Sequence, residues 1–125
     1  MLTSRAGTGG VSMMAVLICL AAGIKPIITS SSDEKLASIK KLGQGVEGIN
    51  YKTTTDIVAE VQRLTNGKGV DFVINNTGIG SIPENIASLR SKAGAISLVG
   101  FLNGFTADWN HSVLLNLMSK RAKLQ

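Results

Sequence analysis

Apolar residues form two kinds of run that alternate along the chain. Short runs rich in β-branched residues are typical of strands buried in a sheet, and longer runs with apolar residues three or four positions apart are typical of helices. The short runs lie at 1–6, 24–29, 46–50, 70–74 and 95–99, and the helical runs follow them at 11–22, 31–42, 57–64, 81–89 and 113–118. This alternation predicts an α/β fold, a doubly wound parallel sheet with helices on both faces.

Local signals refine the expected helix ends. Two helices are predicted to begin with capping boxes, Ser31-x-x-Glu34 and Ser81-x-x-Glu84, in which the serine hydroxyl accepts a hydrogen bond from the first turn. The run 11–22 is apolar nearly all round, so we expect that helix to be buried on more than one side. The residues Ala122–Gln125 resemble the opening of a sixth strand, and all of 1–125 is expected to form a single domain.

Composition narrows the class of protein. The chain has 125 residues, of which 44% are hydrophobic and 17% charged, with 2 prolines, so it is not a disordered segment. Cys19 and His111 are its single cysteine and histidine, which exclude an internal disulfide and leave no basis for a metal site. The apolar run 13–22 is too short to span a bilayer. We interpret it as a core helix rather than a signal peptide, and we expect a cytoplasmic protein without a membrane partner.

The chain carries a net charge of +5, which suits an anionic partner, although an ordinary basic surface explains it equally well. Its three Phe, one Tyr and one Trp do not alternate with basic clusters. A base-stacking surface for nucleic acid is therefore not expected, and a phosphorylated small molecule fits better.

One glycine motif stands where phosphate binding is expected. Gly7-x-Gly9-x-x-Ser12 lies between the first predicted strand and its helix. Gly7 would allow a tight turn, Gly9 would let the backbone approach a pyrophosphate, and Ser12 is small enough to keep helix and strand close. The amides of Gly10 and Val11, at the positive end of the helix, would bind the phosphates. The motif predicts a dinucleotide site; a glycine-rich turn without a ligand is the alternative.

The end of the second predicted strand bears on which dinucleotide is bound. About 20 residues after the glycines, an acidic side chain normally binds the ribose 2′-hydroxyl of NAD. Here that position is Ser30, followed by Ser31 and, one turn on, Lys35. Hydroxyl and ammonium groups would accept a 2′-phosphate, which an acid would repel. The sequence therefore favours NADPH over NADH, although Ser31 could serve only to cap a helix.

Several segments together resemble the cofactor domain of medium-chain dehydrogenases/reductases, above all the zinc-type alcohol dehydrogenase-like and quinone oxidoreductase-like members. The matching segments are Gly7–Ser12, Ala22–Gly23, Thr29–Leu36, Leu42–Gly43, Ile49–Lys52 and Ile96–Phe101. The resemblance covers nearly the whole chain. It implies an NADP-dependent oxidoreductase that transfers a hydride to a small-molecule carbonyl, quinone or enone.

The same resemblance implies which residues bind NADP(H). Lys35 and Tyr51 match residues that contact the 2′-phosphate in NADP-using relatives. The loop Asn76-Thr77-Gly78 matches one that lies along the cofactor, and the segment Gly100-Phe101-Leu102 matches one that approaches the nicotinamide. Tyr51 could instead pack against the sheet edge, and Phe101 could belong to the core.

The departures from this family leave the function open. Its members carry an N-terminal catalytic domain, with zinc in some, that has no counterpart here, and the chain stops near the start of the sixth strand. No catalytic residue can therefore be named. A binding-only remnant and a stand-alone non-redox enzyme, such as an isomerase or cyclase, remain alternatives. The unfinished sheet edge at the C-terminus predicts a homo-oligomer.

Two other enzyme classes are excluded by what the chain lacks. The segment Asn75–Gly78 resembles one in short-chain dehydrogenases, but these require a Tyr-x-x-x-Lys pair, and Tyr51 is followed four places on by Thr55. A Ser/His/Asp hydrolase is unsupported because His111 is the only histidine and no nucleophile motif accompanies it.

Overall fold

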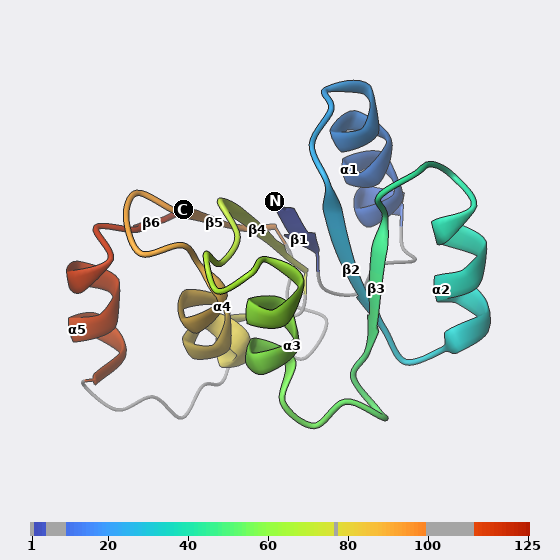
Figure 1. The fold of residues 1–125 in the computed structure, drawn as a ribbon. Coiled ribbons are helices and arrows are strands. Elements are labelled where there is room, and N and C mark those ends of the chain that lie inside the picture. The colour runs from blue at the N-terminus through green and yellow to red at the C-terminus, as the bar shows by residue number, and fades with distance from the viewer. Residues whose placement is uncertain (1, 5–9, 77, 100–111) are drawn as a thin grey trace.

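Six parallel strands form one sheet in the computed structural model, which describes residues 2–4, 10–76, 78–99 and 112–125 (Figure 1). The strand order is β3-β2-β1-β4-β5-β6, and every pairing is parallel. The strands are β1 (Leu2–Ser4), β2 (Pro26–Ser30), β3 (Glu47–Asn50), β4 (Phe72–Asn75), β5 (Ala95–Leu98) and β6 (Lys123–Leu124). The predicted doubly wound parallel sheet is confirmed.

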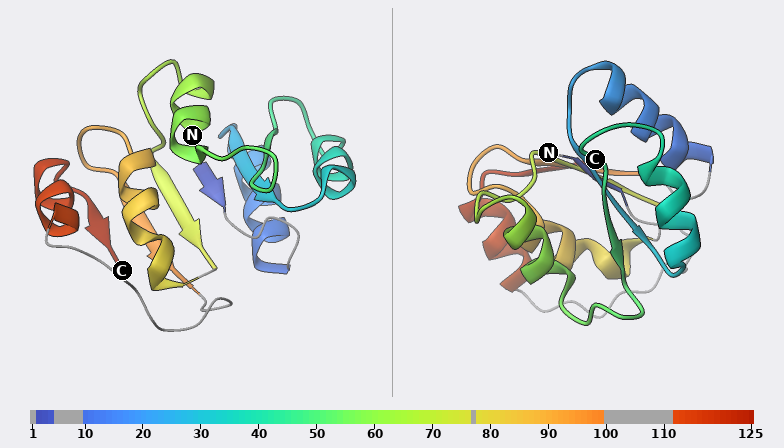
Figure 2. Two further views of the ribbon diagram at one scale, coloured as in Figure 1. Left: turned by 90° about the horizontal axis from the view of Figure 1, so that it is seen from below. Right: turned by 45° about the vertical axis from the view of Figure 1, so that its right-hand side comes forward.

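Helices cover both faces of this sheet, as the side view in Figure 2 shows. One face carries α1 (Gly10–Ala21) and α2 (Asp33–Lys40), and the other carries α3 (Ile57–Leu64), α4 (Ile82–Ser88) and α5 (Ser112–Ser119). A short 3₁₀ turn, η1 (Ile79–Ser81), precedes α4. Crossovers between parallel strands are right-handed as a rule. Because the strand order runs outward from β1 in two opposite directions, such crossovers place helices on opposite faces of the sheet.

The core has two parts, one on each face of the sheet. Successive residues of a strand point to opposite faces, so Ile27 packs with Val61 and Ile86 beneath α3 and α4, while Ile28 packs with Val16 and Leu36 beneath α1 and α2. Both isoleucines are fully buried. Each contributes about 1.5–3 kcal/mol by leaving water, which explains why two adjacent positions of β2 are both apolar.

The predicted caps are wrong in detail. Ser32, not Ser31, caps α2: its backbone is extended and its Oγ accepts a hydrogen bond from the amide of Lys35 at 3.4 Å. β2 runs on through Ser30, so the first residue able to turn the chain into the helix lies one place later than expected. Ser81 stands at the N-cap of α4 but makes no capping bond, since its hydroxyl is bonded to the preceding loop.

The expectation that α1 is buried on more than one side is also wrong. Ala15, Val16 and Cys19 face the sheet and are buried, whereas Met14, Leu17 and Ile18 are exposed. Within the described residues, α1 packs on the sheet and along α2, where Val16 meets Leu36, and its opposite side stays exposed.

The chain ends in a short sixth strand, as predicted. Leu124 pairs with Ile96, and the backbone of Gln125 is bonded to both Ile96 and Leu98 of β5. The turn before β6 is tied to α4, because Lys120 Nζ donates to the carbonyls of Ile86 and Leu89 at 2.8 and 2.9 Å. A cation at the C-terminal end of a helix is favoured by the helix dipole, while burial lowers the pKa of this lysine.

Candidate functional site

The carboxyl ends of the parallel strands meet at one edge of the sheet. Strand order reverses at β1, which lies between β2 and β4, and ligands of such sheets bind in the crevice outside this switch point. The register places Ser30 beside Asn50 on one side of β1 and Asn75 beside Leu98 on the other. The residues that the sequence singled out near strand ends therefore share this edge.

Hydrogen bonds join the ends of β2, β3 and the start of α2 into one corner. The amide of Tyr51 donates to the carbonyl of Ser30 at 3.1 Å. Asn50 Nδ2 donates to Asp33 Oδ1 at 2.9 Å, across the gap between β3 and α2. The buried Ser30 hydroxyl accepts from the amide of Ser32 at 3.3 Å. The backbone that carries Ser30 and Tyr51 is thus fixed by local contacts.

The side chains at this corner suit a phosphate. Lys35 is exposed in the first turn of α2, Tyr51 is exposed just after β3, and Ser31 is half-buried between β2 and α2. Since Ser32 caps the helix, Ser31 is not committed to that role. Ammonium and hydroxyl donors next to a positive helix end are the groups that bind phosphate, so this donor set fits the predicted 2′-phosphate subsite. Tyr51 does not pack as a core residue.

A second group of residues forms the loop after β4. Asn75 is fully buried, Asn76 is nearly so, and Gly78 is buried with a positive φ of 121°. Asn75 Oδ1 accepts from the amide of Gly78 at 3.0 Å, and its Nδ2 donates to the Gly78 carbonyl at 3.1 Å. Sequence reasoning named Asn76 and Gly78 but missed Asn75, as it missed Asn50. Their only sequence signal is an amide in the last position of a strand.

The remaining predicted residues are only partly accounted for. Gly10 and Val11 are the first residues of α1, so the helix begins directly after the glycine cluster as expected. The others lie outside the described residues, which leaves their predicted roles untested: Gly7, Gly9, Thr77, Gly100, Phe101 and Leu102.

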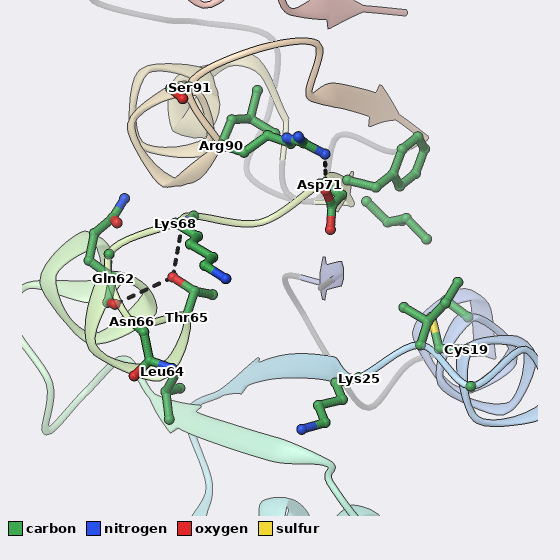
Figure 3. Close-up of a pocket in the computed structure, with 18 of the residues that line it drawn as sticks. Cys19, Lys25, Gln62, Leu64, Thr65, Asn66, Lys68, Asp71, Arg90 and Ser91 are labelled. Carbon is green, nitrogen blue, oxygen red and sulfur yellow. Dashed lines mark hydrogen bonds and ion pairs between the residues drawn. The ribbon is translucent and has the colours of Figure 1, made fainter.

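A large cavity of about 1970 Å³ lies elsewhere (Figure 3). It is bordered by α1, by the turn after α3 and by residues that precede β2, β4 and β5, including Lys25, Asp71 and Arg90. These are amino-terminal ends of strands, so the cavity is at the edge opposite Ser30 and Asn75. Arg90 Nη1 and Asp71 Oδ1 are paired there at 2.7 Å. Cys19 also lines this cavity, and burial raises the pKa of its thiol.

Neither a metal centre nor a membrane span is found in the described part of the chain. Its histidine, cysteine and acidic side chains form no group of three that could hold a metal ion. None of its helices combines the length and apolarity needed to cross a bilayer.

Comparison with known proteins finds relatives that match most of the chain. A family model described as zinc-binding dehydrogenase matches residues 10–125. A zinc-type alcohol dehydrogenase-like protein of Schizosaccharomyces pombe is 40% identical over 121 residues, which are 95% of this chain and 34% of that protein. The L-threonine 3-dehydrogenase of Pyrococcus horikoshii is 28% identical over 115 residues, 90% of this chain and 32% of that enzyme.

Solved structures show the same fold. The quinone oxidoreductase of Escherichia coli complexed with NADPH superimposes with a TM-score of 0.84 at 25% identity, over 99% of this chain and 36% of that one. The quinone oxidoreductase of Pseudomonas syringae superimposes with a TM-score of 0.84 at 28% identity, over 99% of this chain and 37% of that one. The chain therefore spans about a third of the length of the proteins it matches.

Proposed function

This chain belongs to the zinc-binding dehydrogenase family, and we propose on that premise that it binds NADP(H) as the cofactor domain of an oxidoreductase. The observation that carries the proposal is the corner formed by Ser30, Lys35 and Tyr51 beside the switch point of the sheet. A hydroxyl stands at the strand end in place of an acid, and the neighbouring Asp33 carboxylate is bonded to Asn50. The likeness to a quinone oxidoreductase complexed with NADPH supports it.

Each part of the edge has a distinct task in binding. Ser30, Ser31, Lys35 and Tyr51 hold the adenosine 2′-phosphate, and the first amides of α1 at Gly10 and Val11 hold the pyrophosphate. The loop 76–78 and the segment 100–102 border the nicotinamide half. NADPH, when bound, supplies a hydride for a carbonyl, quinone or enone substrate, and the residues of this chain orient it and shield it from water.

Zinc has no part in this proposal. The family takes its description from zinc, yet the described residues offer no group of three suitable ligands. The described donors at the edge are hydroxyls, amides and ammonium groups, which suit phosphate rather than a borderline-soft cation.

The cofactor preference can be tested through the dissociation constants of NADPH and NADH at one fixed ionic strength. A charge-assisted contact with phosphate contributes about 1.5–3 kcal/mol, or about one to two decades of affinity. Lys35→Ala should therefore weaken the binding of NADPH by about 10- to 100-fold and leave the affinity for NADH nearly unchanged. Ser30→Asp should reverse the preference, because a carboxylate repels the 2′-phosphate and accepts from a free ribose hydroxyl.

Lys40→Ala is the matched control, because Lys40 is an exposed lysine in the last turn of the same helix. This substitution also removes one positive charge, but at a position away from the corner. It should leave the ratio of the NADPH and NADH dissociation constants unchanged. If Lys35→Ala behaves like Lys40→Ala and Ser30→Asp also leaves the ratio unchanged, the 2′-phosphate assignment is wrong. Assay of the chain 1–125 with an enone separates an enzyme from a binding-only domain.

We also propose that the chain forms a homo-oligomer through its C-terminal sheet edge. Among the described strands, β6 pairs only with β5, so its outer edge offers unpaired backbone groups. Beside it, α5 exposes Leu114, Leu115 and Met118. An apolar helix face next to an open strand is suited to meet a second copy of the same surface.

A further inference from the structure

Asn75 is a buried amide that is bonded to both backbone groups of the same glycine. Its Oδ1 and Nδ2 contact the amide and the carbonyl of Gly78 at 3.0 and 3.1 Å, and Nδ2 also donates to Ser81 Oγ at 2.8 Å. The Ser81 hydroxyl in turn donates to the Gly78 carbonyl at 3.0 Å. Gly78 has a φ of 121°, a conformation that L side chains rarely adopt. The Asn75 amide thus clamps a loop whose backbone is unusual.

The backbone of Asn75 fixes a second segment at the same time. Its carbonyl accepts from the amide of Val99 at 2.9 Å, directly after β5. One residue therefore ties down the loop after β4 by its side chain and the exit of β5 by its main chain. Both exits lie on the far side of β1 from Ser30.

The two halves of a doubly wound sheet each bind one nucleotide of a dinucleotide, on either side of the switch point. Under the proposed function, Ser30 and Lys35 serve the adenosine half. The exits of β4 and β5 are then left to the nicotinamide nucleotide, which never touches the corner at Ser30. A residue that shapes these exits should affect the binding of the nicotinamide half of the cofactor and not the binding of the adenosine half.

We propose that Asn75 is a positioning residue for the nicotinamide half of NADP(H), an inference that rests on the proposed function. Its side-chain amide must both donate a hydrogen bond to Gly78 and accept one from it. A carboxylate at this position could accept from the Gly78 amide and from the Ser81 hydroxyl, but it would lose the bond that Nδ2 donates to the Gly78 carbonyl and would face that oxygen at hydrogen-bond distance. Gly78 would then leave the backbone conformation that the Asn75 amide holds.

Asn75→Asp, which is nearly isosteric, tests this in the full chain 1–125. Calorimetry gives the dissociation constants of NADPH and of adenosine 2′,5′-bisphosphate, which carries the 2′-phosphate but no nicotinamide. Loss of one buried hydrogen bond is worth about tenfold in affinity, so NADPH should bind about tenfold more weakly. The bisphosphate should bind within about twofold of its normal affinity, a split that general loosening of the fold would not produce.

Ser81→Ala and Ser88→Ala form a matched pair that keeps the test valid if Asn75→Asp does not fold. Both serines belong to the η1–α4 segment, but Ser88 Oγ donates to the Glu84 carbonyl, away from the loop. Ser81→Ala should weaken the binding of NADPH severalfold, and Ser88→Ala should leave it unchanged. Equal effects of the two changes, or parallel losses of NADPH and bisphosphate, would overturn the positioning role alone. An unsubstituted chain that binds neither ligand would overturn the proposed function and this role with it.

Discussion

Gly69 shows how a single residue can join two parts of the fold. It has a φ of +78°, and a Cβ on it would lie 2.6 Å from the carbonyl oxygen of Leu89 and 2.7 Å from the amide nitrogen of Arg90. This close approach lets Val70 exchange backbone hydrogen bonds with Ser88 and Arg90, at 2.9 and 2.8 Å. The start of the β4 region and the exit of α4 are therefore in direct contact.

Gly69→Ala should destabilise the fold more than Gly67→Ala does. Gly67 has nearly the same φ, +79°, but no atom lies within 4 Å of its added Cβ. Its substitution costs only the strained dihedral, about 1–2 kcal/mol. The clash at Gly69 adds about 1–3 kcal/mol more. Urea denaturation of both variants measures the difference, and equal losses would mean that the backbone contact carries no energy.

At the scale of one element, the start of α2 depends on which of three consecutive serines caps it. Ser32 accepts from the Lys35 amide, whereas Ser31 makes no capping bond. Ser32→Ala should reduce the free energy of unfolding by about 1 kcal/mol, and Ser31→Ala should change it by less than about 0.5 kcal/mol. Thermal denaturation distinguishes them. A larger loss from Ser31→Ala would restore the capping box that the sequence predicted.

These serines also show how far sequence patterns reach. The periods of apolar residues reflect burial on a strand or helix face, so they predicted the five α-helices and the strands β1 to β5, but not the short 3₁₀ turn η1. In the run Ser30-Ser31-Ser32 each residue could cap a helix, and only the length of β2, set by pairing with β3, decides among them. Ser30 could be predicted as a site residue from its place at a strand end. Asn50 and Asn75 also end strands, but the sequence could not predict their roles, because their bonds reach Asp33 and Ser81 on other elements.

At the scale of the whole molecule, association through the C-terminal edge should respond to charge on α5. Met118 on α5 is 73% exposed and Met14 on α1 is 58% exposed, and the two helices lie on opposite faces of the sheet. Met118→Lys should raise the dissociation constant of the oligomer by about tenfold or more, since it places a charge in an apolar contact. Met14→Lys should leave it unchanged. Light scattering over a concentration series measures both.

A monomer at high concentration in the unsubstituted chain would contradict the edge as an association surface. So would an equal response to the two lysine substitutions, because that would indicate general apolar aggregation rather than a contact at α5 and β6.

The central place of β1 has a consequence for the order in which the molecule can assemble. Leu2 pairs with Pro26 on one side and with Phe72 on the other, so the middle of the sheet cannot close until β4 has joined β1. Contacts between residues so distant in sequence slow folding, because the intervening chain must be ordered first. During folding, β1 therefore keeps one edge open until β4 docks against it, and this is the period in which a chaperone would have most to protect.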